Sequence, residues 1–310
     1  MDLTLKYRPK TFNDVVGQNF ITNILKRQVE THTFKNTYLF CGAWGDGKTT
    51  CARILANEIN KGKGAPIEID GASNNGVDSI RALIEDSQTS AVGADYKVYI
   101  IDEAHMITVQ GWNAALKLIE EPPTHCVFIF CTTNPEKLPS TILSRVQRFD
   151  FKKISVGEIV ERLKYILKGE NISAYHRDAL IKIATLSDGH MRDAVIMLGA
   201  CLDVDKNISV ELVESVFGLV TQDSVNTFIK SLLLKDMSKC VETYEHCKER
   251  SFDGIKLYDA ILSTVLDAIL KGRNDIRPLL NILYDNRKML TRDNADSIFK
   301  YIIAVSCNEC

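Results

Sequence analysis

The sequence predicts an α/β domain with a parallel sheet, followed by helical regions. Strand-like and helix-like segments alternate over roughly the first 150 residues, which is typical of parallel sheets. The strand-like runs at 97–102 and 126–132 are almost entirely apolar, as in parallel strands that are buried on both faces. From residue 156 onward, apolar residues recur at three- and four-residue spacing, the period of a helix.

The pattern predicts the elements in chain order. Residues 12–30 are expected to form a helix after an extended, proline-containing lead at 7–10. There follow a strand at 36–41, a helix at 48–59, a turn at 61–64, a strand at 67–69, a helix at 77–88, a strand at 97–102, a helix at 109–120 and a strand at 126–132. Strand signals fade after residues 149–151, and residues 156–203 and 209–306 are expected to be helical.

Composition and charge limit the possible functions. The chain has 310 residues, of which 45% are hydrophobic and 25% charged, and a net charge of −2. Its length suits two or three domains. The charge excludes a generally basic nucleic-acid coat, so any DNA contact must come from a local patch or from several subunits together. Without a membrane-spanning apolar run or a signal-peptide layout, we expect a cytoplasmic protein with no membrane partner.

The cysteines do not predict a zinc site. Nine cysteines are scattered along the chain, and in a reducing compartment they are most simply free thiols. Cys307 and Cys310 form a single C-x-x-C, which lacks the second ligand pair that zinc requires. Cys240 and Cys247 do not have the spacing of such a pair.

Residues 42–49 match a phosphate-binding loop at every fixed position. They read G-A-W-G-D-G-K-T and lie between a predicted strand and a predicted helix, as G-x-x-x-x-G-K-[ST] requires. Glycines let the backbone turn its N–H groups toward a phosphate, and the helix N-terminus adds partial positive charge. A glycine-rich turn before a structural helix is the alternative. The loop predicts ATP and Mg²⁺ as cofactors, bound by Gly42, Gly45, Asp46, Gly47, Lys48, Thr49 and Thr50.

Roles within that group follow from the chemistry of phosphoryl transfer. Lys48 is expected to reach the β- and γ-phosphates and the Thr49 hydroxyl to ligate Mg²⁺. Asp102 and Glu103 end a buried strand, at the sheet edge where the loop also lies. Asp102 is expected to hold Mg²⁺, and Glu103 to orient the attacking water. An acidic surface turn is the alternative, and the phosphate loop disfavours it.

Three further polar residues stay ambiguous on spacing alone. Thr133 follows the strand at 126–132, where it either contacts the γ-phosphate or the water, or favours a turn before Pro135. Arg145 and Arg192 are single arginines, which are more often solvated surface residues than functional groups.

In combination, these segments resemble the AAA+ clamp-loader ATPases of DNA replication, above all the tau/gamma family of the bacterial replicative polymerase. The resemblance covers about the first 200 residues. Besides the phosphate loop it rests on residues 7–12 (Y-R-P-K-T-F), 15–18 (V-V-G-Q), 68–73 (E-I-D-G-A-S), 102–106 (D-E-A-H-M), 118–123 (L-I-E-E-P-P), 132–139 (T-T-N-P-E-K-L-P), 140–145 (S-T-I-L-S-R) and 189–194 (G-H-M-R-D-A).

The resemblance implies an architecture and further site residues. It implies an AAA+ P-loop NTPase core at 1–154, a helical lid at 155–206 and a helical collar that joins subunits at 207–310. The pocket for adenine and ribose would be lined by Lys6, Tyr7, Arg8 and Val16.

The same comparison implies roles for the ambiguous residues. Thr133 matches the sensor that follows the fourth core strand. Arg145 matches the arginine finger, which acts in trans on ATP of the neighbouring subunit, and Arg192 matches the lid sensor for ATP in its own subunit.

The implied function is that of an ATP-hydrolysing clamp-loader subunit. Its partners would be a sliding clamp, primer–template DNA and other loader subunits in a ring, with five as the expected number. One alternative is another AAA+ DNA motor such as a branch-migration helicase. A non-hydrolysing structural subunit is a second, disfavoured because Lys48, Thr49, Asp102, Glu103 and Arg145 are all present.

The chain departs from the family pattern in three ways. Residues 57–66 contain no cysteine where the bacterial subunits carry a zinc module, so no zinc is carried over. The motif Ser-Arg-Cys is Ser144-Arg145-Val146, which keeps the arginine. The length of 310 residues indicates a phage-encoded or minimal form, an expectation that rests on size alone.

Surface roles are the least specified by the sequence. The helix from Val77 and the loop at 89–93 lie where family members meet the clamp. Asn74, Asn75, Gly76 and Lys117 either face DNA or serve as a cap, a turn and a solvated lysine. Ten apolar residues fill either a subunit-joining collar or an ordinary helical core: Leu232, Leu233, Val241, Tyr244, Ile255, Leu257, Ile261, Leu262, Val265 and Leu266.

Overall fold

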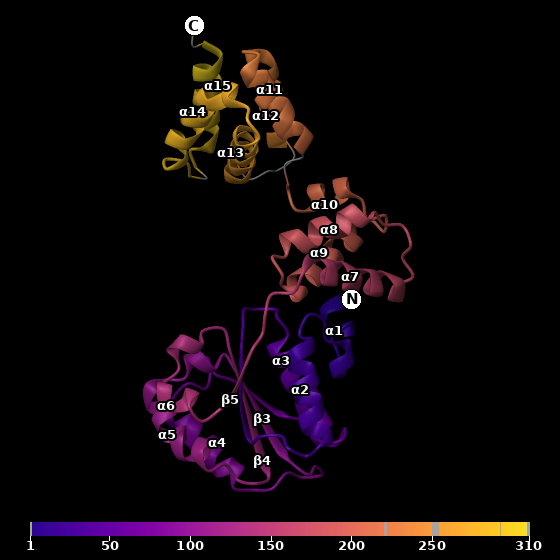
Figure 1. Ribbon diagram of the computed structural model, residues 1–310, viewed down its shortest axis with the longest axis vertical. Coiled ribbons are helices and arrows are strands. Elements are labelled where there is room, and N and C mark those ends of the chain that lie inside the picture. The colour runs from indigo at the N-terminus through magenta and orange to yellow at the C-terminus, as the bar shows by residue number, and fades with distance from the viewer. Residues whose placement is uncertain (1, 220–221, 250–253, 292, 309–310) are drawn as a thin grey trace. The chain divides into compact units, whose positions relative to one another are not determined.

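The computed structural model describes residues 2–219, 222–249, 254–291 and 293–308 (Figure 1). The chain divides into two compact units, Met1–Ala200 and Cys201–Cys310. Each unit has a hydrophobic core of its own. Within the described ranges, no helix has both the length and the apolarity needed to cross a membrane.

The first unit is built on a parallel sheet, as the sequence predicts, and the sheet has five strands. The strands are β1 (Thr37–Cys41), β2 (Ile67–Asp70), β3 (Lys97–Asp102), β4 (Cys126–Thr132) and β5 (Gln147–Asp150), in the order β2-β3-β4-β1-β5. Phe130 of β4 is paired with Leu39 of β1 and with Ile101 of β3. This register places the carboxyl ends of β1, β4 and β3 side by side.

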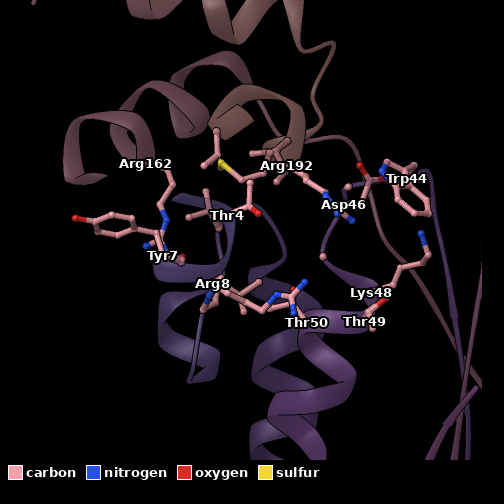
Figure 2. Close-up of a pocket in the computed structure, with 18 of the residues that line it drawn as sticks. Thr4, Tyr7, Arg8, Trp44, Asp46, Lys48, Thr49, Thr50, Arg162 and Arg192 are labelled. Atoms are coloured by element: carbon pink, nitrogen blue, oxygen red, sulfur yellow. Dashed lines mark hydrogen bonds between the residues drawn. The ribbon is translucent and has the colours of Figure 1, made fainter. Parts of the chain in front are cut away.

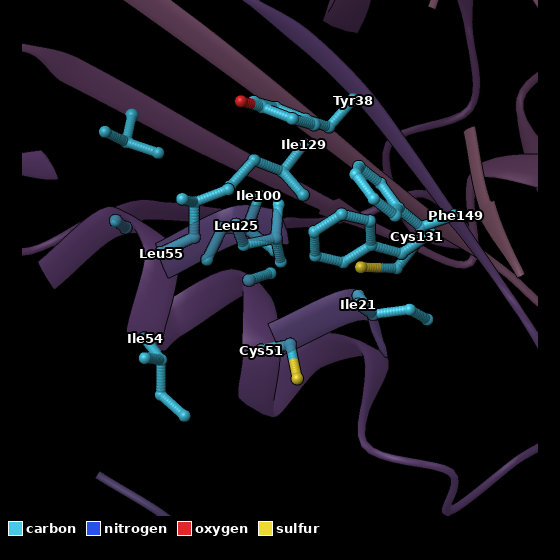
Figure 3. Close-up of a cluster of buried hydrophobic side chains, with 14 of the residues drawn as sticks. Ile21, Leu25, Tyr38, Cys51, Ile54, Leu55, Ile100, Ile129, Cys131 and Phe149 are labelled. Carbon is cyan, nitrogen blue, oxygen red and sulfur yellow. The ribbon is translucent and has the colours of Figure 1, made fainter. Parts of the chain in front are cut away.

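Alternate side chains of the central strands supply two separate cores. Phe40, Ile100 and Ile129 face the helices α2 (Asn19–Glu30) and α3 (Lys48–Ile59). Their neighbours Leu39 and Ile101 face the other side of the sheet, because strand residues alternate between faces. Helices α4 (Val77–Ser87), α5 (Val109–Glu120) and α6 (Ser140–Leu143) cover that second face (Figure 1). Figure 3 shows the core under α2 and α3.

The predicted helix at 12–30 is wrong in its first third. Residues Phe12–Asp14 form a single 3-10 turn, η1, and the α-helix α2 begins only at Asn19. Gly17 separates the two with φ of +77°, and a Cβ there would come within 2.9 Å of the Ile154 side chain. The break buries Phe12 in the core and leaves Val16 on a pocket. A further short helix, α1 (Leu3–Lys6), which the sequence pattern did not indicate, precedes the extended lead.

Helices α7 (Val156–Gly169), α8 (Arg177–Leu186) and α9 (Met191–Val204) follow the sheet. Ser155 and Glu158 cap α7 reciprocally, which satisfies the free N–H groups at its start. The segments η2 (Ala104–Met106) and η3 (Pro135–Lys137) are short 3-10 turns after β3 and β4. The predicted helical character of residues 156–203 is confirmed, whereas the boundaries at 154 and 206 stay predictions.

The second unit is helical throughout its described parts. Its elements are α10 (Val210–Val216), α11 (Gln222–Leu233), α12 (Met237–Glu249), α13 (Gly254–Leu270), η4 (Asn274–Ile276), α14 (Arg277–Arg287) and α15 (Ala295–Asn308). Tyr244 stacks on the fully buried Phe299, and Tyr258 and Phe228 approach the same ring edge-on. Residues 220–221, 250–253 and 292 of the predicted helical run, and Cys310 of the C-x-x-C, lie outside the described residues.

The ten apolar residues noted in the sequence fall into two groups. Seven of them belong to the hydrophobic core of the second unit or pack against it: Leu232, Tyr244, Ile255, Leu257, Ile261, Leu262 and Val265. The other three, Leu233, Val241 and Leu266, are exposed. Most of these residues therefore stabilise the unit itself, and a role in joining subunits stays a prediction.

Asp296 predicts an acid-sensitive contribution to the stability of the second unit. Lys300, Lys248 and Tyr244 donate to its carboxylate at 2.8, 3.0 and 3.1 Å, and they lower its pKa from the ordinary 3.8 to about 2. A depressed carboxyl pKa stabilises the fold above pH 3.8, and the contribution is lost as pH falls toward 2. Because the side chain is 39% exposed, we expect Asp296→Asn to cost only about 0.5–1 kcal/mol at pH 7.

Urea unfolding of the full chain, followed by far-UV circular dichroism, tests this expectation. Both tryptophans, Trp44 and Trp112, lie in the first unit, so fluorescence does not report on the second. Asp267→Asn, which removes an exposed carboxylate from α13, is the matched control. A difference in unfolding free energy between wild type and Asp296→Asn that does not become smaller as the pH falls from 5 toward 2 would contradict the assigned role.

Candidate nucleotide-binding site

The phosphate loop connects β1 to α3 and depends on two left-handed glycines. Gly45 and Gly47 have φ of +81° and +97°, a region that side chains disfavour. Gly47 is the N-cap of α3, so the first N–H groups of that helix open onto the loop. A Cβ on Gly45 would lie 3.3 Å from the Cβ of His190, so the loop packs closely against the segment that precedes α9.

The side chain of Lys48, the first residue of α3, is buried within the phosphate loop. Its side chain is 6% exposed, and Nζ donates to the carbonyl oxygens of Gly42 and Ala43 at 2.9 and 2.7 Å. Gly42 is itself fixed, since its N–H donates to Thr132 of β4 at 3.2 Å. The ammonium is thus held within the phosphate loop, on the pocket that the loop lines, where a lysine of this motif would contact phosphate oxygens.

A pair of oxygen ligands suited to Mg²⁺ lies beside the loop. The hydroxyl of Thr49 donates to Oδ2 of Asp102 at 2.8 Å, so both side chains reach one point. Mg²⁺ is typically bound through one or two protein oxygens together with substrate phosphates and water. Among the residues that the structure describes, no cluster of three or more His, Cys, Asp or Glu side chains is placed to hold a metal without such help. The donor set therefore fits a nucleotide-bound Mg²⁺.

Glu103 is held in an unusual backbone conformation next to Asp102. Its φ is +47°, and its N–H donates to Oδ1 of Asp102 at 3.0 Å. Residues in this region are often strained and cluster at functional sites. The Glu103 carboxylate lies 3.3 Å from Nδ1 of His105 and 3.5 Å from the Thr133 hydroxyl. The single hydrogen of that hydroxyl has a nearer acceptor in Oδ1 of Asn134, at 2.9 Å. These neighbours leave Glu103 oriented toward the end of β4.

One pocket collects most of the sequence-predicted site residues (Figure 2). It is lined by Tyr7, Arg8, Val16, Gly45, Asp46, Gly47, Lys48, Thr49, Thr50, Asp102, Glu103 and Arg192. Gly42 and Thr133 do not line it, although each contacts a lining residue. Other lining residues were not predicted, among them Thr4, Trp44 and Arg162. Thr4 and Arg162 belong to no motif, and Trp44 lies at a position that the phosphate-loop motif leaves unspecified.

The N-terminal segment forms one wall of this pocket through Tyr7. Its hydroxyl donates to Glu170 at 2.6 Å, and its carbonyl oxygen accepts from Arg162 at 2.7 Å. Burial, and then the Glu170 carboxylate, raise the pKa of Tyr7 to about 12, so the phenol stays protonated. Burial also lowers the pKa of the half-buried Arg162 guanidinium. Residues from α7 therefore hold the start of the chain in place.

Lys6 departs from the expected position in the pocket wall. Its ammonium pairs with Glu170 at 2.6 Å, and it does not line the pocket. The same ion pair is the largest cause of the lowered pKa of Glu170. The physical reason is geometric: Lys6 ends α1, and its ammonium is held by Glu170, the residue that follows α7. Tyr7 bonds the same carboxylate, but it lines the pocket together with Arg8.

Arg192 and Arg145 lie in different places. Arg192, in the first turn of α9, has its guanidinium 5.3 Å from the centre of the Trp44 ring in the phosphate loop. Arg145 follows α6 and does not line the pocket. Its Nε pairs with Glu120 at 2.6 Å and its Nη1 donates to the carbonyl oxygen of Thr141 at 2.7 Å. Arg145 therefore does not reach the nucleotide site of its own chain.

Gly45→Ala is expected to weaken nucleotide binding. The substitution places a Cβ at φ of +81° and 3.3 Å from His190, which costs about 1–2 kcal/mol of backbone strain and pushes loop and lid apart. We expect the affinity for Mg²⁺–ATP to fall about tenfold, measured by equilibrium binding of a fluorescent ATP analogue. Gly76→Ala is the matched control, since φ there is −83° and a Cβ would meet nothing within 4 Å. Equal effects of the two substitutions would contradict the strain assigned to Gly45.

Comparison with known proteins identifies relatives for most of the chain. Residues 66–155 match the family model described as DNA polymerase III, delta subunit. The tau subunit of DNA polymerase III from Bacillus subtilis is 38% identical over 85% of this chain and 51% of its own length. The gamma subunit of DNA polymerase III from Buchnera aphidicola is 32% identical over 96% of this chain and 88% of its own length. The chain thus spans about half the length of the Bacillus relative.

Solved structures of lower sequence identity support the fold. The RuvB protein of Thermotoga maritima superimposes with a TM-score of 0.59 at 20% identity, over 73% of this chain and 79% of that one. This likeness shows the fold alone. The gamma subunit from Buchnera carries the family assignment, because the similarity extends over nearly the whole of both chains. The chain belongs to the gamma/tau family of DNA polymerase III subunits.

Proposed function

We propose that this chain hydrolyses ATP as a subunit of a clamp loader, which opens a sliding clamp and places it on primer–template DNA. The observation that carries the proposal is the convergence of Lys48, Thr49, Asp102, Glu103 and Arg192 on one pocket in a member of the gamma/tau family. A chain that only served as a structural subunit would not need all five groups in one place. As a replication protein, it would act in the cytoplasm.

The protein groups have separate tasks in the proposed reaction. Mg²⁺, when bound with the nucleotide, would neutralise charge on the β- and γ-phosphates, and Thr49 and Asp102 are the residues that would hold it. Lys48 binds the terminal phosphates. The Glu103 carboxylate accepts a hydrogen bond from the attacking water and so directs an oxygen lone pair at the γ-phosphorus. Thr133, whose hydroxyl lies 3.5 Å from Glu103, is proposed as the sensor that contacts the γ-phosphate or the attacking water.

Arg145 acts on a neighbouring subunit in this proposal. Its position beyond α6, away from the pocket of its own chain, leaves its guanidinium 37% exposed and paired with Glu120. A cation supplied across an interface stabilises the charge of the transition state and accelerates hydrolysis by about 10³–10⁵-fold. Hydrolysis then depends on assembly with neighbouring subunits, in a ring for which we propose five members.

Other surfaces are assigned to the proposed partners by position. Helix α4 and the loop at 89–93 are proposed to contact the clamp, and Val92 at the tip of that loop is 99% exposed. The second unit is proposed to join subunits, for which exposed apolar residues such as Leu234 and Leu270 are available. Asn74, Asn75 and Lys117 remain weaker candidates for DNA contacts.

Steady-state ATP hydrolysis tests the function directly. The full chain would be assayed with its co-encoded replication proteins in three conditions: without DNA, with primer–template DNA, and with primer–template DNA plus the cognate clamp. We expect strong stimulation that requires both the clamp and primed DNA, because the loaded complex completes the catalytic geometry. Stimulation by DNA alone, unchanged by the clamp, would instead favour a DNA motor such as a branch-migration helicase.

An experiment that mixes two variants tests whether Arg145 is an arginine finger that acts on the neighbouring subunit. Lys48→Ala removes the phosphate contact but keeps Arg145, whereas Arg145→Ala keeps ATP binding and loses hydrolysis. If Arg145 acts in trans, a mixture of the two within one assembly regains hydrolysis that neither variant has alone. Arg148→Ala, which removes an arginine paired only with Asp150 two residues away, is the matched control and should hydrolyse ATP normally. Normal turnover by an assembly that contains only Arg145→Ala would refute the assignment.

A further inference from the structure

Asp46 is a buried carboxylate inside a loop that is built to bind anions. Its side chain is 1% exposed, and Oδ2 accepts a hydrogen bond from the N–H of Ala43 at 2.9 Å. An ionised carboxylate is costly to bury unless it is paired, and here it also lies among groups that would contact a triphosphate. The phosphate-binding motif leaves position 46 unspecified, so the motif does not explain this residue.

His190 pairs with Asp46 from the other side of the pocket. Its Nδ1 lies 3.1 Å from Oδ1 of Asp46, and because an ionised carboxylate only accepts hydrogen bonds, Nδ1 carries the hydrogen. The backbone around His190 is fixed as well. Its N–H donates to Ser187 at 2.9 Å, and its carbonyl oxygen accepts from Ala194 in the first turn of α9. The pair therefore joins the phosphate loop to the start of α9.

The start of α9 also carries Arg192, two residues after His190. The guanidinium of Arg192 lies over the ring of Trp44, 5.3 Å from its centre, and Trp44 is another loop residue that the motif leaves unspecified. Figure 2 shows Trp44, Asp46 and Arg192 near one another on the loop side of the pocket. The phosphate loop thus holds the backbone next to Arg192 through the contact of Asp46 with His190. It holds the side chain of Arg192 through Trp44.

We propose that Asp46, His190 and Trp44 are positioning residues that fix Arg192 over the phosphate site. The inference rests on the proposed ATP-binding function and assigns a task to residues outside the motif. A flexible arginine must be ordered before it contacts phosphate, so fixing it in advance lowers the cost of binding. The same contacts transmit the state of the loop to α9, since a shift of the loop moves the histidine to which it is bonded.

A double-mutant cycle on Mg²⁺–ATP affinity tests the proposal. His190→Ala and Asp46→Asn should each weaken binding of a fluorescent ATP analogue to the full chain by about three- to tenfold. In an Arg192→Ala background, the same substitutions should have less than about a twofold effect, because the residue they position is absent. His190→Asn keeps an N–H donor near the place of Nδ1, so it should restore affinity to within about twofold of wild type. Trp44→Leu should show the same dependence on Arg192.

His176→Ala is the matched control for the lid. His176 also directly precedes a helix, α8, but it is exposed and its side chain caps nothing. It should leave ATP affinity unchanged in both backgrounds. Thermal unfolding checks that each variant is folded, and Asp46→Asn, which keeps the size of the side chain, is the variant of least structural disturbance.

The outcomes separate the two levels of inference. Effects of His190→Ala and Asp46→Asn that are as large with Arg192→Ala as without it would overturn the positioning role and leave the proposed ATPase intact. An unchanged affinity for Mg²⁺–ATP in both His190→Ala and Asp46→Asn would also overturn the positioning role and leave the proposed ATPase intact. If the wild-type chain does not bind Mg²⁺–ATP at all, the positioning role and the proposed function fail together.

Discussion

The register of three parallel strands is the constraint on which the site depends. Phe130 of β4 is paired with both Leu39 of β1 and Ile101 of β3, so the three strands end together. The phosphate loop, the acidic pair Asp102 and Glu103, and Thr133 then emerge at one edge of the sheet. A slip of two residues would move one strand end by about 6.6 Å, beyond the reach of the Thr49–Asp102 hydrogen bond.

Polar ties across the pocket are the second feature that shapes the site. Glu170 holds Lys6 and Tyr7 of the N-terminal segment, and Asp46 holds His190 at the start of α9. Each of these two contacts consists of a few hydrogen bonds between residues around the pocket. The two cores of the first unit, in contrast, consist of closely packed apolar side chains. The first unit thus combines closely packed apolar cores with a pocket whose walls are joined by a few hydrogen bonds.

Much of the fold and of the candidate site can be predicted from the sequence, because the signals that predict them are local. Buried parallel strands are continuous apolar runs, and the phosphate loop has a fixed spacing of glycines, lysine and threonine. The helix at 12–30 was misjudged because the break at Gly17 depends on its contact with Ile154, which no local pattern reveals. For the same reason, the sequence placed Lys6 in the pocket, and it gave no sign that Arg162 or His190 contributes.

The amino-acid sequence alone identifies the candidate site residues: a phosphate loop, an acidic strand end and arginines in the order of a gamma/tau subunit. Which side chains meet is visible only in the folded chain. Tyr7 contacts Glu170 across 163 positions of sequence, and His190 contacts Asp46 across 144. Local backbone geometry follows from neighbouring residues, because their hydrogen bonds and sterics act over a few positions. Contacts between distant positions depend on how every intervening element packs, so they appear only in the folded chain.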